Sequence, residues 1–143
     1  MRYVTAPLSI RFDPKILDRL RRRAQANPGS TPSGLAQRLV DEGLRMAEHP
    51  GVVFKDGPSG RRAAMTSGPD VWEIVKILRE VDERGPAAIT AAAELLALPE
   101  AKVRVGMHYY AAYQDEIDSE VDEADRTSVA REAAWESEQR LLG

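Results

Sequence analysis

Hydrophobic and polar residues alternate near the amino terminus of this 143-residue chain. Leu8, Ile10 and Phe12 are apolar, and Ser9 and Arg11 between them are polar. This period of two predicts a short strand with one buried and one polar face. The backbone of such a strand needs a partner, which the same strand of a second copy would supply. The pattern therefore predicts an intertwined homodimer.

Two helical patterns follow the strand. Asp13 and Pro14 form a start signal, with Asp13 as N-cap, and Asn27-Pro28-Gly29 is expected to end the first helix. A second start signal at Thr31-Pro32-Ser33 opens a helix that should reach Ala47. The apolar positions are Ile16, Leu17, Leu20 and Ala24 in the first helix, and Leu35, Leu39, Val40, Leu44 and Ala47 in the second.

The segment from Tyr3 to Ala47 resembles the ribbon-helix-helix family of repressors, which includes Arc, MetJ and CopG. The resemblance implies a two-stranded ribbon, made by two copies, that enters the DNA major groove. It assigns base readout to Pro7, Ser9 and Arg11, phosphate contact to Thr31, Ser33 and Gly34, and the dimer core to Leu8, Ile10, Phe12, Leu20 and Leu39. Arg11 should be the strongest reader, because a guanidinium can bond guanine at two points. The alternative is an ordinary domain with an edge strand and a solvated arginine face.

Residues 48–118 combine a hairpin pattern with three helices. His49-Pro50-Gly51 ends the preceding helix, and the stretch from Val52 to Ala64 is typical of a β-hairpin turning within residues 55–60. Gly68-Pro69-Asp70 begins an apolar helix, and Gly85-Pro86 breaks it. Helices at 87–98 and 99–113, joined by a short turn, then predict a helix-turn-helix in a small winged-helix-like domain.

The same part of the chain resembles a prokaryotic antitoxin family whose members often stand beside PIN-like nuclease toxins. The matching pieces are residues 49–54, 60–63, 68–73, 109–113 and 116–118. The resemblance implies that the protein neutralises a PIN-like ribonuclease by binding it. Lys102, Arg104 and His108 could contact DNA, but the favoured role of this domain is structural, as a second dimer contact or as part of a platform for the partner.

After Asp125 the helical spacing resumes, so residues 119–143 predict an acidic amphipathic tail. Antitoxins commonly end in a segment that orders on the toxin. By that resemblance Trp135, Leu141 and Leu142 would anchor the tail on the toxin, and Arg131 or Arg140 would pair with its catalytic carboxylates. The alternative is a tail that docks on the middle domain of its own chain.

The charge is uneven along the chain, although the total is only -3. Residues 1–47 hold nine Lys/Arg and four Asp/Glu, a net of +5, and residues 48–113 hold eight and nine, a net of -1. Residues 114–143 hold three and ten, a net of -7. The basic end suits phosphate and the acidic end suits a basic protein partner.

Several classes of function find no support in the residues. Without cysteine there is no disulfide framework or thiolate metal site, and the two histidines have no acid at ligand spacing. The serines form no nucleophile arrangement, and Asp115, Glu116 and Asp118 are interpreted as a solvated face. We expect no active site, cofactor, metal or membrane segment, and a cytoplasmic location.

These patterns predict a mainly α chain: a ribbon-helix-helix unit (1–47), a hairpin and helix-turn-helix domain (48–118) and a helical tail (119–143). The expected function is that of a homodimeric antitoxin that binds a PIN-like toxin and represses its own operon at operator DNA. Pairing of dimers into tetramers stays open. One alternative is a stand-alone ribbon-helix-helix regulator with a sensor or oligomerisation domain. Another is an enzyme fused to a DNA-binding arm.

Overall fold

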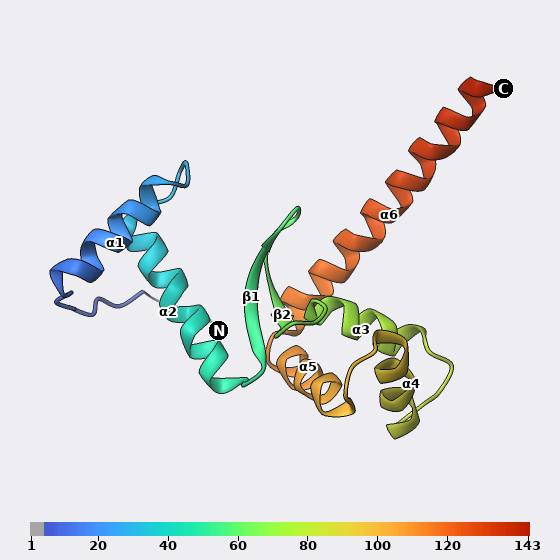
Figure 1. The fold of residues 1–143 in the computed structure, drawn as a ribbon, viewed down its shortest axis with the longest axis horizontal. Coiled ribbons are helices and arrows are strands. Elements are labelled where there is room, and N and C mark those ends of the chain that lie inside the picture. The colour runs from blue at the N-terminus through green and yellow to red at the C-terminus, as the bar shows by residue number, and fades with distance from the viewer. Residues whose placement is uncertain (1–4) are drawn as a thin grey trace. The chain divides into compact units, whose positions relative to one another are not determined.

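The computed structural model describes residues 5–143, which are mainly helical with one two-stranded antiparallel sheet (Figure 1). The helices are α1 (Pro14–Gln25), α2 (Pro32–Glu48), α3 (Val71–Glu80), α4 (Pro86–Leu96), α5 (Glu100–Ala112) and α6 (Gln114–Leu142); the strands are β1 (Val52–Gly57) and β2 (Gly60–Met65). The chain divides into two compact units, Met1–Leu44 and Arg45–Gly143, which we call unit 1 and unit 2. Helix α2 begins in unit 1, and its last turn belongs to unit 2.

Both helices predicted for unit 1 are present. The Asp13 carboxylate accepts a hydrogen bond from the Lys15 N–H at 2.8 Å, and Pro14 occupies the first turn of α1. Gly29, after the end of α1, has a φ of +80°, a value that favours glycine. At the start of α2, the Gly34 N–H donates to Thr31 Oγ1 at 3.0 Å. The predicted start signals are therefore confirmed as helix caps.

The predicted strand at residues 8–12 is not formed in the single chain. Residues 5–13 carry neither helix nor strand. The sheet present in residues 5–143 is that of β1 and β2, which pair with each other. A strand exists only where a second strand satisfies its N–H and C=O groups. Any ribbon at Leu8–Phe12 would thus require a second copy.

The predicted hairpin is confirmed, with a tighter turn than the sequence indicated. The strand pairs run from Val52 with Met65 to Gly57 with Gly60, so the turn consists of Pro58 and Ser59. Gly60 has a φ of +107°, which explains a glycine directly after the turn. The strands therefore continue through residues that the sequence assigned to the loop.

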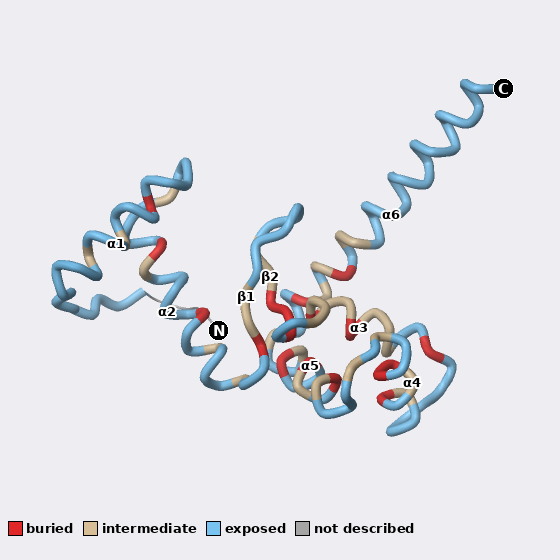
Figure 2. The backbone as a smooth tube through the Cα atoms, viewed as in Figure 1, coloured by how far each residue is buried: buried red, intermediate tan, exposed pale blue. Residues whose placement is uncertain are grey.

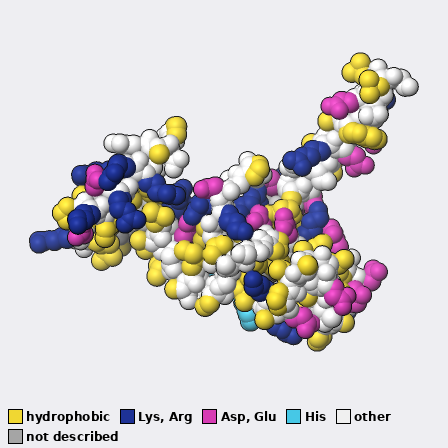
Figure 3. All heavy atoms as spheres, in the orientation of Figure 1, with side chains coloured by type: hydrophobic (Ala, Val, Ile, Leu, Met, Phe, Trp, Pro, Cys, Tyr) yellow, Lys and Arg dark blue, Asp and Glu magenta, His cyan; other side chains and the backbone are white. Residues whose placement is uncertain are grey.

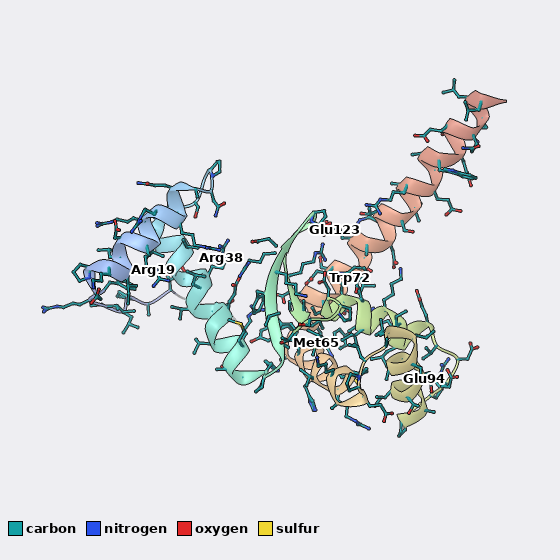
Figure 4. The ribbon with its side chains drawn as sticks, in the orientation of Figure 1. Arg19, Arg38, Met65, Trp72, Glu94 and Glu123 are labelled. Atoms are coloured by element: carbon teal, nitrogen blue, oxygen red, sulfur yellow. The ribbon has the colours of Figure 1, made fainter. Side chains whose placement is uncertain are left out.

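The core of unit 2 lies between the hairpin and helices α3, α4, α5 and the first part of α6. Met65 at the end of β2 (Figure 4) and Ile74 of α3 are fully buried. Gly106 lets α5 approach α3 closely, because a Cβ there would lie 2.9 Å from Ile74 Cδ1. The apolar helix predicted after Asp70 is thus a core helix. The turn between α4 and α5 passes through Ala97, which has a φ of +53°.

Helix α6 is one continuous helix of 29 residues and passes through the boundary predicted at residues 118 and 119. Its first part packs into the core of unit 2 through Ile117 and Val121, which are buried. From Asp125 onward every residue is exposed (Figure 2). The tail predicted as a separate segment is therefore the exposed extension of a helix that is anchored in unit 2. Within residues 5–143, no helix is both long and apolar enough to cross a membrane.

Candidate functional site

The residues predicted to read bases lie in the segment before α1. Pro7, Ser9 and Arg11 are all exposed. Leu8 and Ile10, assigned to the dimer core, are also exposed, at 81% and 56%. Both faces of the alternating segment thus reach solvent in the single chain, so its apolar side chains have no cover there.

The two helices of unit 1 leave further apolar side chains exposed. In the described part of the unit, the buried apolar residues are Ala24 and Leu35. Leu39 is 39% exposed and Leu20 is half-buried, and both line a shallow hollow together with Ile16. The larger exposed apolar residues of the unit are Leu8, Ile10, Phe12, Ile16, Leu39, Val40 and Leu44. Two buried apolar residues are a small core, and a contiguous set of exposed apolar side chains is typical of an interaction surface.

Basic side chains lie beside this apolar surface. Figure 3 shows Lys and Arg side chains gathered over α1. Arg19, labelled in Figure 4, lines the hollow with Arg22 and Arg23. Unit 1 therefore combines an apolar surface with a strongly basic one, which suits phosphate.

The predicted phosphate contacts lie at the beginning of α2. Thr31, Ser33 and Gly34 are exposed there, and Pro32 contributes no N–H. The Gly34 N–H is already bonded to the Thr31 hydroxyl. A phosphate at this helix end would have to replace that bond or accept from Ser33 instead.

A partly buried polar network in unit 2 was not predicted from the sequence. Arg45 Nη1 donates to the Tyr109 hydroxyl at 2.8 Å and to Glu116 Oε1 at 3.0 Å. The Tyr109 hydroxyl in turn donates to Glu116 Oε2 at 2.9 Å, and the Arg45 guanidinium lies 4.0 Å from the centre of the Tyr113 ring. Since Tyr109 is fully buried, burial raises the pKa of its hydroxyl and keeps it a neutral donor. The network joins the last turn of α2, α5 and α6.

The next residue along α5 repeats this arrangement nearer the surface. Tyr110 accepts from Arg79 Nη2 at 2.9 Å and donates to Asp118 Oδ1 at 2.9 Å. The hydrogen bond from Arg79, with that from Tyr110, lowers the pKa of Asp118. Glu116 and Asp118 are still 41% and 42% exposed, in keeping with the solvated face expected from the sequence, and each also binds an arginine and a tyrosine. Two adjacent tyrosines followed seven and eight residues later by acids were the available signal.

Arg62 of β2 and Glu120 of α6 form a second polar contact inside unit 2. Their side chains are 10% and 13% exposed, and Arg62 Nη1 lies 3.4 Å from Glu120 Oε1. These two atoms are buried and make no hydrogen bond in the described structure, while Arg62 Nη2 donates to Glu123 at 2.9 Å (Figure 4). Burial raises the pKa of the Glu120 carboxyl to about 7, although the Arg62 charge opposes the shift.

The raised pKa of Glu120 makes the stability of unit 2 depend on pH. A carboxyl with a pKa of 4.5 when unfolded and about 7 when folded binds more protons in the folded state between those values, so stability falls as the pH rises through them. We expect Glu120→Gln to raise the free energy of unfolding by about 1 kcal/mol at pH 8, allowing for solvent screening. At pH 4.5 the substitution should leave the free energy of unfolding almost unchanged. Urea denaturation at both pH values measures this. An equal effect at both would assign the change to packing.

The predicted toxin contacts lie together near the end of α6. Arg131, Trp135 and Arg140 are exposed, and Leu141 and Leu142 are 86% and 80% exposed. Figure 3 shows hydrophobic side chains collected at this end of the helix. The structure thus places these residues on one exposed stretch of helix, where two leucines and a tryptophan face solvent.

Residues 5–143 contain no group of three or more acidic or histidine side chains placed to hold a metal ion. Comparisons with protein-family models, with curated proteins and with solved structures found no match to this chain.

Proposed function

We propose that the protein is a homodimeric DNA-binding antitoxin. Unit 1 would pair with a second copy and bind operator DNA as a ribbon-helix-helix module. The observation that supports this most is the set of exposed apolar side chains in unit 1, together with the basic residues of α1. A second copy is the simplest cover, because an alternating segment such as Leu8–Phe12 can pair with its own copy.

DNA is the partner that the basic surface of unit 1 favours. Residues 1–47 carry a net charge of +5, and the major groove is wide enough for a two-stranded ribbon. The ribbon's outward side chains would be Ser9 and Arg11, which are exposed in the single chain. Phosphates would be held by the amino end of α2 at Ser33, with the Thr31 cap opening toward the DNA.

Arg11→Ala tests the base readout. We expect this variant to bind its operator more weakly by about 1–3 kcal/mol and to lose sequence preference, because Arg11 would bond a base. Fluorescence anisotropy with operator and scrambled duplexes, repeated over a salt series, measures both quantities. Arg61→Ala in the unit 2 hairpin is the matched control and should leave the preference unchanged. If Arg11→Ala lowers binding equally on both duplexes, Arg11 contacts phosphate rather than a base.

The exposed end of α6 supports the second half of the proposal, which is binding of a PIN-like ribonuclease. Trp135 and Leu142 are apolar, while Arg131 and Arg140 supply positive charge for an acidic nuclease site. A helix that extends from a folded unit already has its conformation, so less ordering entropy is lost when a partner binds. A stand-alone regulator remains the second candidate, and in that case α6 would bind no nuclease.

Deleting residues 124–143 separates these two candidates. For an antitoxin, we expect the shortened chain to lose its complex with the product of the neighbouring gene, while DNA binding by unit 1 is kept. Co-expression followed by size-exclusion chromatography with light scattering measures the complex, and anisotropy measures DNA binding. A complex that survives the deletion would place the toxin surface elsewhere. A full-length chain that never captures its neighbour would favour the stand-alone regulator.

A further inference from the structure

The packed face of α6 continues into the exposed part of the helix. Ile117 and Val121 are buried against unit 2, and steps of three and four residues lead from them along the same side. The continuation, which we call the α6 stripe, consists of Ala124, Ser128, Arg131, Trp135, Glu138 and Leu142. Alternating steps of three and four are the pattern of a helix that packs against another helix. Since every residue from Asp125 onward is exposed, unit 2 itself places no second helix against this part of the stripe.

We infer that the α6 stripe is covered by α6 of a second copy, packed in the antiparallel direction. In a parallel pair, Arg131 would face Arg131 and Glu138 would face Glu138, so both contacts would be repulsive. In an antiparallel pair, Arg131 of each helix comes within reach of Glu138 of the other. The charges of the stripe are therefore complementary to the same stripe reversed.

Side-chain size supports the same direction. With the pair centred near Ala133, Leu142 lies opposite Ala124 of the second copy, so the largest aliphatic side chain meets the smallest. Trp135 lies opposite Arg131 of the second copy, an arrangement that allows a cation–π contact. Ala134 and Leu141 border the stripe and widen its apolar side.

Unit 2 offers a site for the end of the second helix. A groove runs where α6 leaves the body of unit 2. Its apolar lining comes from Pro58 of the hairpin turn, Trp72 of α3 and Ala124 of α6, and charged side chains such as Asp56 and Glu73 lie beside them. Trp72 is held in place by a 3.0 Å hydrogen bond from its Nε1 to Asp70. In the antiparallel pair, the end of the second α6 reaches Ala124 and thus this groove. Its two terminal leucines would find apolar cover there.

The inference rests on the proposed function, because the same exposed part of α6 is assigned there to the toxin. A helix pair of about 19 residues is marginal by itself. Joining two copies through unit 1 would raise the effective concentration of their α6 helices. The stripe would then be covered in the free protein, and a toxin would have to separate the pair before it could bind. Pairing of α6 is thus a built-in competitor of toxin binding.

Single cysteines test the direction of the pair without any toxin. The chain has no cysteine of its own, so each introduced thiol is unique. In the antiparallel pair the two copies of residue 134 lie near each other across the seam, whereas the two copies of residue 142 are about 27 Å apart, which is 18 residues of helix. We expect full-length Ala134→Cys to give a covalent dimer with a short bismaleimide at low micromolar protein, and Leu142→Cys to give none.

Charge reversal tests whether the stripe itself forms the contact. In the Ala134→Cys background, Arg131→Glu alone and Glu138→Arg alone should each lower the cross-linking rate at least tenfold. Both changes together should restore it, because the ion pairs return with exchanged signs. Circular dichroism of each variant verifies that α6 stays helical. Cross-linking at residue 142, no cross-linking at either residue, or a rate that ignores the charges would each overturn the inference. Since no toxin is present, none of these results depends on whether the chain binds a toxin. Operator binding by the same variants reports separately whether unit 1 still joins the two copies.

Discussion

Ile10→Asp is expected to abolish both dimer formation and operator binding. In the proposed ribbon, Ile10 lies on the inner face. A dimer would therefore bury two Ile10 side chains, one from each copy. A carboxylate there would lose its hydration without gaining a partner, which costs several kcal/mol per dimer. Ile10 lies in unit 1, so the same change should leave the fold of unit 2 undisturbed.

Sedimentation equilibrium and operator anisotropy measure these two losses. Ser9→Asp is the matched control, because it introduces the same charge at the neighbouring residue on the outward face. That variant should remain a dimer and bind DNA more weakly, through repulsion of phosphate. The cooperative unfolding of unit 2 should be the same in both variants. An Ile10→Asp chain that is dimeric and binds operator normally would show that residues 8–12 do not form the dimer contact.

Local signals predicted most of the elements. The caps at Asp13 and Thr31, the apolar helix after Asp70 and the hairpin from Val52 are each determined by neighbouring residues, and each appears in the structure. The strand at residues 8–12 is different, because its formation depends on a partner strand that one chain does not contain. The alternation is a property of the sequence, whereas pairing is a property of an assembly.

The contacts within unit 2 were harder to predict, because they join residues far apart in the chain. Arg45 and Glu116 are 71 positions apart, and although the spacing of Tyr109 and Glu116 is a local signal, nothing local connects either of them to Arg45. The continuity of α6 was missed for a related reason. Charged residues such as Asp122 and Asp125 obscure the apolar spacing between Val121 and Trp135, although helix α6 runs unbroken through them.

The exposed surfaces of the two units have a common physical basis. In unit 1 the apolar side chains outnumber what two short helices can bury, and in unit 2 the packing face of α6 extends past the core it serves. Neither surface is covered by other residues of its own unit. We have proposed assembly for both surfaces, and the charged residues beside each favour a different partner: phosphate next to α1, and a reversed copy next to Arg131 and Glu138.

Tyr109→Ala should be the most destabilising substitution in unit 2. Its ring is fully buried and packs at 5.3 Å from His49 and 4.7 Å from Tyr113, measured between ring centres. Removing the ring leaves a cavity. It also leaves Arg45 and Glu116 without the hydroxyl that both of them bond. We expect a loss of about 3–5 kcal/mol in the free energy of unfolding, enough to unfold much of a domain of ordinary stability.

Two milder variants divide this loss between the ring and the hydroxyl. Tyr109→Phe keeps the ring and removes the donor to Glu116, and it should cost about 1–3 kcal/mol because the groups left behind are partly buried. Tyr110→Phe removes an equivalent hydroxyl between Arg79 and Asp118, where water can replace it, and should cost about 0.5 kcal/mol or less. Urea unfolding followed by tryptophan fluorescence gives all three values. Equal losses for the two phenylalanine variants would mean that the Arg45–Tyr109–Glu116 network is no stronger than the more exposed Arg79–Tyr110–Asp118 network. In that case the Tyr109 ring, and not its hydroxyl, would anchor α6 to α5.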